Sequence, residues 1–126
     1  MDSGSSVSSI MVKRIVSVTS GTKAGTALKA MENSNLSLIP VIDEGRLVGV
    51  IQDVLADRMK TPVGTVKEIM GRPLFVEKRS SIDQVVRYIN KHGISRVPVV
   101  ESAIGMHCIG IVSASQLLKA KKSMRR

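Results

Sequence analysis

The apolar positions of this chain form one pattern twice, 58 residues apart. Ser37–Ile42 (Ser-Leu-Ile-Pro-Val-Ile) returns as Ser95–Val100, and a second apolar segment follows each, at Leu47–Ile51 and Cys108–Val112. Apolar runs of this length are typical of strands in a sheet that is covered on both faces. The pattern therefore predicts two copies of one small structural unit.

A helical pattern precedes these strands in each copy. Ala24, Ala27, Leu28 and Met31 form the apolar stripe of a helix from about Lys23 to Asn33, and Ile82, Val85, Val86 and Ile89 form the matching stripe in the second copy. Thr22 and Ser80 are expected to cap the two helices at their N-termini. Asn35 and Gly93 are expected to end them in a left-handed conformation.

Each copy thus reads as strand, helix, strand, strand, helix. The first strands are expected at Ile15–Val18 and Leu74–Val76, and the last helices near Asp53–Met59 and from Ser115 to about Lys122. Two copies of about 55 residues are each too small to bury a good core alone. We therefore expect an α+β fold in which two pseudo-symmetric βαββα repeats pack through their sheets, with ligand clefts at the seam.

The expected boundaries follow from the repeat. Residues 1–9 form a flexible arm, 10–60 the first repeat, 61–120 the second repeat and 121–126 a basic tail. The Ser-rich start lacks the basic region of a secretory signal, and the apolar runs are too short for a transmembrane helix. A single cysteine, Cys108, allows no internal disulfide, so a cytoplasmic protein is expected.

The net charge of +9 is concentrated at the C-terminus, where the last eight residues hold five Lys or Arg and no acid. Such a tail is usually a solvated segment or complements a helix dipole. Attraction to nucleic acid or to an acidic surface is the competing interpretation. Phe75 and Tyr88 are the only aromatic residues and cannot build a stacking platform for bases, which favours the first interpretation.

Candidate catalytic chemistry is missing from the sequence. It contains no Gly-rich phosphate loop, carboxylate dyad or Ser-His-Asp set. His92, His107 and Cys108 do not have metal-ligand spacing, so no metal site is expected. Cys108 takes the place of Leu47 in the other copy and is expected to be a small buried apolar residue. The sequence indicates a binding module and not an enzyme.

Four short motifs carry a family resemblance. Ile-Met dipeptides stand at Ile10 and Ile69, and apolar-Pro-Val strands stand at Ile39–Val41 and Val97–Val99. With the strand-ending glycines, they resemble a tandem pair of cystathionine β-synthase (CBS) domains, a Bateman module, over roughly Ile10–Ala120. The resemblance implies a regulatory module that requires no cofactor and binds AMP, ADP, ATP or S-adenosylmethionine in clefts between the repeats. It also implies a homodimer that acts as an energy or metabolite sensor for a partner protein.

The family's ligand element is Gly, two apolar residues, Ser or Thr, two variable residues and Asp. Gly110, Ile111 and Ser113 match it, and Gln116 stands where the ribose-binding Asp is expected. The resemblance implies a first cleft in which the arm before Ile10 closes over the base. Its residues are Ile111, Ser113 and Gln116 together with Ser37, Leu38, Ile39 and Pro40.

In copy one the same element places Gln52 at the hydroxyl position and Leu55, which cannot bind ribose, at the Asp position. Arg96, two residues before Pro98, matches a basic residue that binds phosphate in nucleotide-sensing relatives, and guanidinium suits phosphate well. Thr65 matches a polar residue that meets the base or the ribose. The second predicted cleft comprises Gln52, Thr65, Ile69, Met70, Ser95, Arg96, Val97 and Pro98. Pro40 and Pro98 are expected at sheet edges or strand starts.

Two functions follow from these residues. The first is an adenosyl-ligand sensor. The second is an interaction scaffold with degenerate clefts that recruits an acidic protein or nucleic acid through its dimer face and basic tail. We favour the sensor, because the loss of one Asp weakens a cleft without abolishing its shape.

Overall fold

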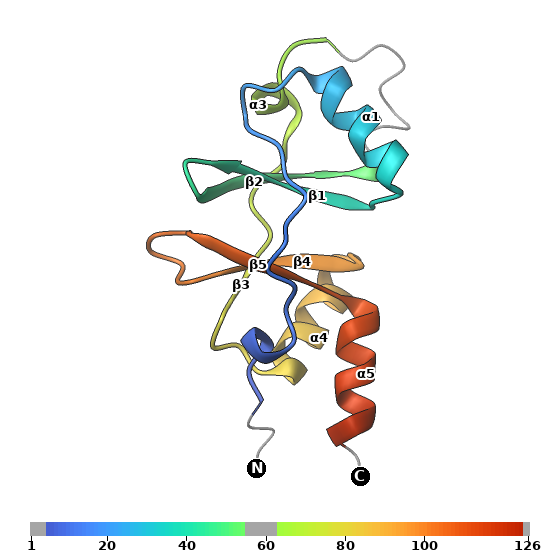
Figure 1. The fold of residues 1–126 in the computed structure, drawn as a ribbon, viewed down its shortest axis with the longest axis vertical. Helices are drawn as coiled ribbons and strands as arrows, with labels where there is room; N and C mark the ends of the chain where they lie inside the picture. Colours follow the sequence, from blue (N-terminus) through green and yellow to red (C-terminus); the bar gives the residue numbers. More distant parts are fainter. Residues whose placement is uncertain (1–4, 55–62, 125–126) are drawn as a thin grey trace. The chain divides into compact units, whose positions relative to one another are not determined.

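A computed structural model describes residues 5–54 and 63–124 of the chain (Figure 1). The chain divides into two compact units. Unit 1 contains the residues up to Ile15 and those from Phe75 onwards, and unit 2 contains Val16–Leu74. Each unit combines a small sheet with helices, so the expected mixed α and β class is confirmed.

Unit 2 is built on an antiparallel hairpin. Its elements are α1 (Ala24–Ser34), β1 (Leu38–Asp43), β2 (Arg46–Gln52) and α3 (Val66–Ile69). Glu44 and Gly45 connect the two strands with φ angles of 50° and 83°, a turn that matches the twist of a hairpin. The apolar stripe of α1 packs on the sheet as predicted, in a core of Ala27, Leu28, Met31, Ile39, Val41, Ile51 and Val66.

Unit 1 repeats this plan with a three-stranded sheet. Its elements are η1 (Val7–Ser9), β3 (Val76–Glu77), α4 (Ile82–His92), β4 (Arg96–Val100), β5 (Cys108–Ser113) and α5 (Ala114–Met124). The strand order is β3-β4-β5, with β3 parallel and β5 antiparallel to β4. The core comprises Val7, Val76, Ile82, Val85, Ile89, Val97, Val99, Val112 and Leu117.

Each compact unit takes in a short segment from outside its own sequence copy. Unit 1 contains the strands of the second copy and also the segment before the first copy, and unit 2 contains the strands of the first copy and also the segment before the second. In unit 1, Val7 is fully buried, and Val12 and Ile111 exchange backbone hydrogen bonds of 2.8 and 2.9 Å. In unit 2, Gly71 and Val50 exchange the equivalent pair. The residues just before Ile10, expected to belong to a flexible arm, thus supply a core side chain. The sequence repeats at 10–60 and 61–120 stay a prediction, and the compact units divide the chain differently.

The helix N-termini differ from the prediction by one residue. Lys23, and not Thr22, is the N-cap of α1 and makes no side-chain cap bond. Ser81, and not Ser80, caps α4 in a reciprocal capping box with Gln84. The Ser80 carbonyl accepts a hydrogen bond from Val7 N–H at 2.8 Å, a tertiary contact that the local pattern does not contain.

The helix C-termini agree with the prediction, because Asn35 and Gly93 both adopt the left-handed conformation. The predicted strand at Ile15–Val18 is reduced to one bridge, between Val18 and Val41. The helix predicted at Asp53–Met59 starts at Asp53, but its residues from 55 onwards lie outside the described residues.

Two further elements are displaced from their predicted positions. The strand predicted at Leu74–Val76 is found as β3, and α5 continues to Met124, into the predicted tail. Pro98 lies within β4, the central strand and not at a strand start, but β3 does not extend as far as Pro98, so the predicted edge position holds locally at this residue. Its missing N–H is tolerated because β3 pairs only with Val99 and Val100.

Candidate functional site

Two predicted ligand residues lie opposite each other at one end of the unit 1 sheet. Arg96 opens β4 and is the register partner of Ser113, the last residue of β5. Directly opposed residues of an antiparallel pair project from the same face of the sheet. The structure therefore brings a guanidinium and a hydroxyl together, although the sequence assigned them to different clefts.

Ser113 and Gln116 bond to each other at the start of α5. The Ser113 N–H donates to Gln116 Oε1 at 2.8 Å, and the Gln116 N–H donates to Ser113 Oγ at 3.3 Å. This reciprocal pair is a capping box. The capping box gives Gln116 a structural role at the start of α5. It uses the side-chain oxygen of Gln116 and leaves the side-chain NH₂ as a donor for a ligand oxygen.

The guanidinium of Arg96 is incompletely satisfied. Among the described residues, Arg96 Nε is buried without a hydrogen-bond partner. Burial also lowers the pKa of Arg96 below its usual value. A buried donor without an acceptor costs about 1–3 kcal/mol, so the site is suited to an anionic oxygen.

The predicted residues of copy one lie in unit 2. Gln52 is the register partner of Leu38, and the Ser37 carbonyl accepts from Asp53 N–H at 2.9 Å. Leu38, Ile39 and Pro40 are buried, so they offer walls and backbone groups instead of polar side chains. Met70 packs on Gly49.

A pocket of about 280 Å³ in unit 2 contains Gln52 and Ile69 from the predicted set. Its other lining residues, which the sequence reasoning missed, are Val50, Val54, Gly71, Arg72 and Leu74. The lining is mostly apolar and includes one amide and one guanidinium, a combination that suits a planar base with a polar substituent. A signal for Arg72 did exist: Lys13 stands at the same distance after the other Ile-Met dipeptide.

Thr65 lies elsewhere in unit 2. It lines a different pocket, of about 620 Å³, beside Lys23 and Lys29. It also forms a backbone bridge with Lys23. The structure thus places the predicted site residues in two sets. One is Ser37, Leu38, Ile39, Pro40, Gln52, Thr65, Ile69 and Met70 in unit 2, and the other is Ser95, Arg96, Val97, Pro98, Ile111, Ser113 and Gln116 in unit 1. Their assembly into clefts stays a prediction.

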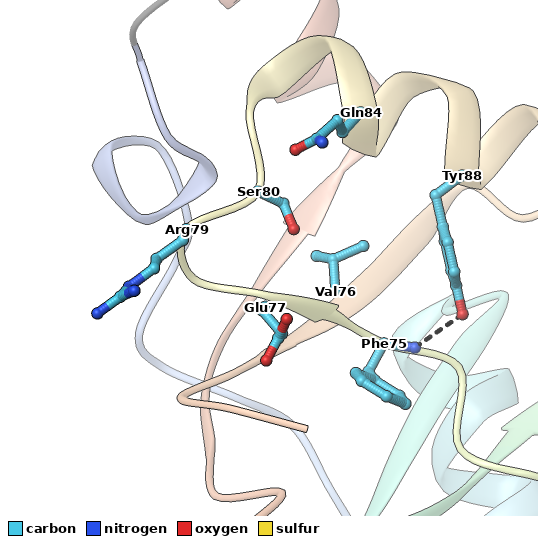
Figure 2. Close-up of a pocket in the computed structure, with 7 residues that line it drawn as sticks. All are labelled: Phe75, Val76, Glu77, Arg79, Ser80, Gln84 and Tyr88. Carbon is cyan, nitrogen blue, oxygen red and sulfur yellow. Dashed lines mark hydrogen bonds between the residues drawn. The ribbon is translucent and has the colours of Figure 1, made fainter. Parts of the chain in front are cut away.

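Unit 1 has a further pocket, of about 530 Å³, between β3 and α4 (Figure 2). Three of its polar side chains already bond to the protein. Tyr88 Oη accepts from Phe75 N–H at 3.0 Å, and Glu77 accepts from Ala103 N–H at 2.8 Å. Gln84 belongs to the α4 capping box. Tyr88 thereby satisfies the backbone N–H of Phe75, next to the edge strand β3. This hydrogen bond gives Tyr88 a structural role.

Cys108 is expected to react slowly with alkylating reagents. It is half-buried in β5, where Sγ donates to the Gly110 carbonyl at 3.7 Å, and burial raises the pKa of the thiol. Because the thiolate is the nucleophile, iodoacetamide at neutral pH should modify it at least about tenfold more slowly than free cysteine. Mass spectrometry of a time course measures this rate.

Unfolding in urea serves as the control, since it should restore the rate of a free thiol. Equal rates for the folded and the unfolded chain would show that the fold does not protect the Cys108 thiol.

Two features are absent from the part of the chain that the structure describes. In residues 5–54 and 63–124, no three His, Cys, Asp or Glu side chains are grouped as metal ligands. None of the helices described there has the length and apolar character needed to cross a bilayer.

Comparison with protein families identifies the chain. The CBS domain family matches it twice, at residues 7–55 and 66–123. These matches include the two Ile-Met segments, the paired strands and the helices described above. The chain belongs to the CBS domain family, and its two copies form a CBS domain pair.

Two solved CBS domain pairs resemble this fold closely. One is the pair of protein MJ0100 in complex with 5′-methylthioadenosine and S-adenosyl-L-methionine, with 27% identity, a TM-score of 0.78 and coverage of 95% of this chain and 98% of that one. The other is CBSX2 from Arabidopsis thaliana in complex with AMP, with 27% identity, a TM-score of 0.80 and coverage of 98% and 100%.

Curated relatives with assigned activities are much longer than this chain. Inosine-5′-monophosphate dehydrogenase of Methanocaldococcus jannaschii is 28% identical over 117 residues, which are 90% of this chain and 23% of the enzyme. L-aspartate semialdehyde sulfurtransferase of the same organism is 30% identical over 122 residues, or 92% and 24%. The chain therefore spans about a quarter of the length of these relatives.

Proposed function

We propose that this CBS domain pair is a non-catalytic regulatory module that binds an adenosine-containing ligand and signals its presence to a partner protein. AMP, ADP, ATP and S-adenosylmethionine are the candidate ligands. The proposal includes a cytoplasmic location and a homodimer, and the oligomeric state is measured by sedimentation equilibrium.

The unpaired Nε of Arg96 is the observation that carries the proposal. This donor is buried, it belongs to a permanent cation, and it lies across the sheet from the Ser113 hydroxyl. A phosphate oxygen would satisfy Arg96 and would replace Gln116 Oε1, at 3.2 Å, as the acceptor of the Ser113 hydroxyl. We therefore assign phosphate binding to Arg96 and Ser113, and contact with the ribose to Gln116.

Within unit 2, the pocket around Gln52 and Ile69 supports the binding of a purine base on its own. Its apolar walls suit a purine ring, and the Gln52 amide offers both a donor and an acceptor. The complexes of the two similar pairs, with AMP and with 5′-methylthioadenosine and S-adenosyl-L-methionine, belong to the same ligand class.

The experiment is a titration of the full chain with AMP, ATP, adenosine and S-adenosylmethionine, followed by thermal unfolding and calorimetry. A ligand at one hundred times its Kd should stabilise the fold by about 2.7 kcal/mol. Arg96→Ala should weaken AMP binding about 10- to 100-fold, the value of a charge-assisted hydrogen bond. Binding of adenosine, which has no phosphate, should be unchanged in this variant.

Arg79→Ala is the matched control, because Arg79 is an exposed arginine of the same unit. It should bind AMP as the wild type does. The proposal is wrong if no adenosyl compound at millimolar concentration raises the melting temperature. Equal loss of AMP and adenosine binding in Arg96→Ala would remove only the phosphate assignment.

A further inference from the structure

A thioether side chain packs on a strand-ending glycine in both units. In unit 2, Met70 lies against Gly49 of β2, where an added Cβ would come within 2.7 Å of Met70 Sδ and 3.0 Å of its Cγ. In unit 1, Met11 takes the same place at Gly110 of β5, with distances of 2.7 and 2.9 Å. Both glycines are buried. The methionines therefore fill the space that a side chain on the strand would otherwise occupy.

Met11 and Met70 contact both the core and the solvent. Met11 packs against the core of unit 1 and Met70 against the core of unit 2, yet each side chain is only half-buried. Met31 belongs to the unit 2 core and is 2% exposed, whereas Met106 is half-buried in the loop between β4 and β5 and belongs to neither core. Among the methionine side chains that the structure describes, only Met11 and Met70 combine access for a reagent with a contact to a core.

An accessible methionine is oxidised by peroxides. A lone pair of the thioether sulfur attacks one oxygen of hydrogen peroxide, the O–O bond breaks, and the other oxygen leaves as water after a proton transfer. The sulfur loses two electrons and gains one oxygen atom, so an apolar side chain becomes a polar sulfoxide. The change matters most where the methionine is packed against apolar side chains.

The surroundings of both sulfurs do not suit a sulfoxide. An S=O oxygen is a hydrogen-bond acceptor, but the backbone atoms that line the same space are the carbonyl oxygens of Gly71 and Val12. The N–H groups of these two residues already donate to Val50 and Ile111. Because a buried acceptor without a donor destabilises the folded state, an oxidised side chain must leave the glycine and turn towards water.

We propose that Met11 and Met70 are paired oxidation sites, at which a peroxide loosens the Ile-Met segments at residues 10–12 and 69–71. In each unit the segment is joined to its sheet by one exchanged pair of backbone hydrogen bonds, so the methionine contact is a large part of its attachment. Methionine sulfoxide is reduced enzymatically, which makes the change reversible.

Oxidation of Met70 also affects the candidate pocket of unit 2. Its neighbours Ile69 and Gly71 line that pocket together with Gln52. The oxidised chain should therefore bind adenosine about tenfold more weakly, the loss expected when one apolar contact is missing. This consequence rests on the proposed function, whereas the oxidation sites do not. Absence of adenosine binding by the reduced chain would remove this consequence alone.

The test treats the full chain with hydrogen peroxide, maps sulfoxides by peptide mass spectrometry and follows urea denaturation by circular dichroism. Met11, Met70 and Met106 should be oxidised at least about tenfold faster than Met31, whose sulfur is shielded. The oxidised chain should unfold at a urea concentration lower by about 0.5 M or more, as expected for a buried polar group without a partner. Methionine sulfoxide reductase should restore the midpoint. Dithiothreitol, added before each measurement, reverses oxidation of the Cys108 thiol to a sulfenic acid or a disulfide.

Leucine supplies the variants, because it has nearly the volume of methionine and is not oxidised by peroxide. The double variant with Met11→Leu and Met70→Leu should keep its urea midpoint after peroxide treatment. Met106→Leu is the matched control, since it removes a half-buried methionine that belongs to neither core. Its midpoint should fall as that of the wild type does.

Three results would overturn the proposal. They are an unchanged midpoint in a wild-type chain whose Met11 and Met70 are mapped as sulfoxides, an equal fall of the midpoint in the double variant and in Met106→Leu, and resistance of Met11 and Met70 to a peroxide concentration that oxidises Met106. The first and the third are measured on the wild type, so they decide the question even if the double variant fails to fold.

Discussion

Replacing Gly49 with alanine is expected to destabilise unit 2 by about 2 kcal/mol. A Cβ at this position would lie 2.7 Å from the Gly71 carbonyl oxygen and 2.7 Å from Met70 Sδ. The carbonyl cannot move freely, because Gly71 and Val50 exchange backbone hydrogen bonds. Alanine also restricts the unfolded chain, which favours folding by about 0.4–1 kcal/mol, less than the cost of the overlap.

Urea denaturation followed by circular dichroism measures this effect. Gly105→Ala is the control, since nothing lies within 4 Å of its added Cβ and its φ angle is not positive. Gly110→Ala should be intermediate: its Cβ would meet Met11 Sδ at 2.7 Å, a flexible side chain, and the Val12 carbonyl only at 3.0 Å. If Gly49→Ala is as stable as Gly105→Ala, the close packing of Met70 and Gly71 on β2 is refuted.

Replacing Val7 with alanine is expected to destabilise unit 1 by about 2 kcal/mol, although Val7 precedes the first sequence repeat as predicted. Its side chain is 0% exposed and belongs to the core with Val85, Val97 and Leu117. Removing two methyl groups from a packed core loses their transfer free energy and leaves a cavity.

Tyr88 is a suitable probe for this variant, because it is the only tyrosine, the chain has no tryptophan, and Tyr88 packs against the unit 1 core. The midpoint of its fluorescence change in urea should fall. Val63→Ala is the matched control: Val63 precedes the second CBS family match, at residues 66–123, but its side chain is 74% exposed. Equal stability of the two variants would show that the N-terminal segment is not part of the core.

The elements that the sequence predicted correctly depend on local patterns. The stripe of α1, the hairpin of β1 and β2 and the left-handed ends at Asn35 and Gly93 follow from periodicity and turn chemistry. The N-cap residues were each misplaced by one position. In α4 the deciding feature is the capping box between Ser81 and Gln84, a local Ser-x-x-Gln pattern that selects the second of two adjacent serines.

In the candidate site, too, local motifs predicted some features and only the tertiary structure determined others. Family motifs identified Arg96, Ser113 and Gln52 as candidate binding residues, because each stands at a fixed distance from a strand proline or a strand-ending glycine. The motifs did not predict that Arg96 and Ser113 are partners across β4 and β5, since strand register depends on the fold of the loop between them. The sequence reasoning did not place Arg72 in the pocket, because the preceding residue, Gly71, pairs with Val50 in the sheet of the other sequence copy.

By itself, the sequence determined that this protein is a duplicated α and β unit of the CBS family, because hydrophobic periodicity and short motifs are properties of neighbouring residues. The tertiary structure alone decided which segment completes which core, and that Arg96 has a buried donor with no partner in residues 5–54 and 63–124. Both depend on contacts between residues far apart in the chain, and burial, which makes such contacts favourable, exists only after the chain has folded.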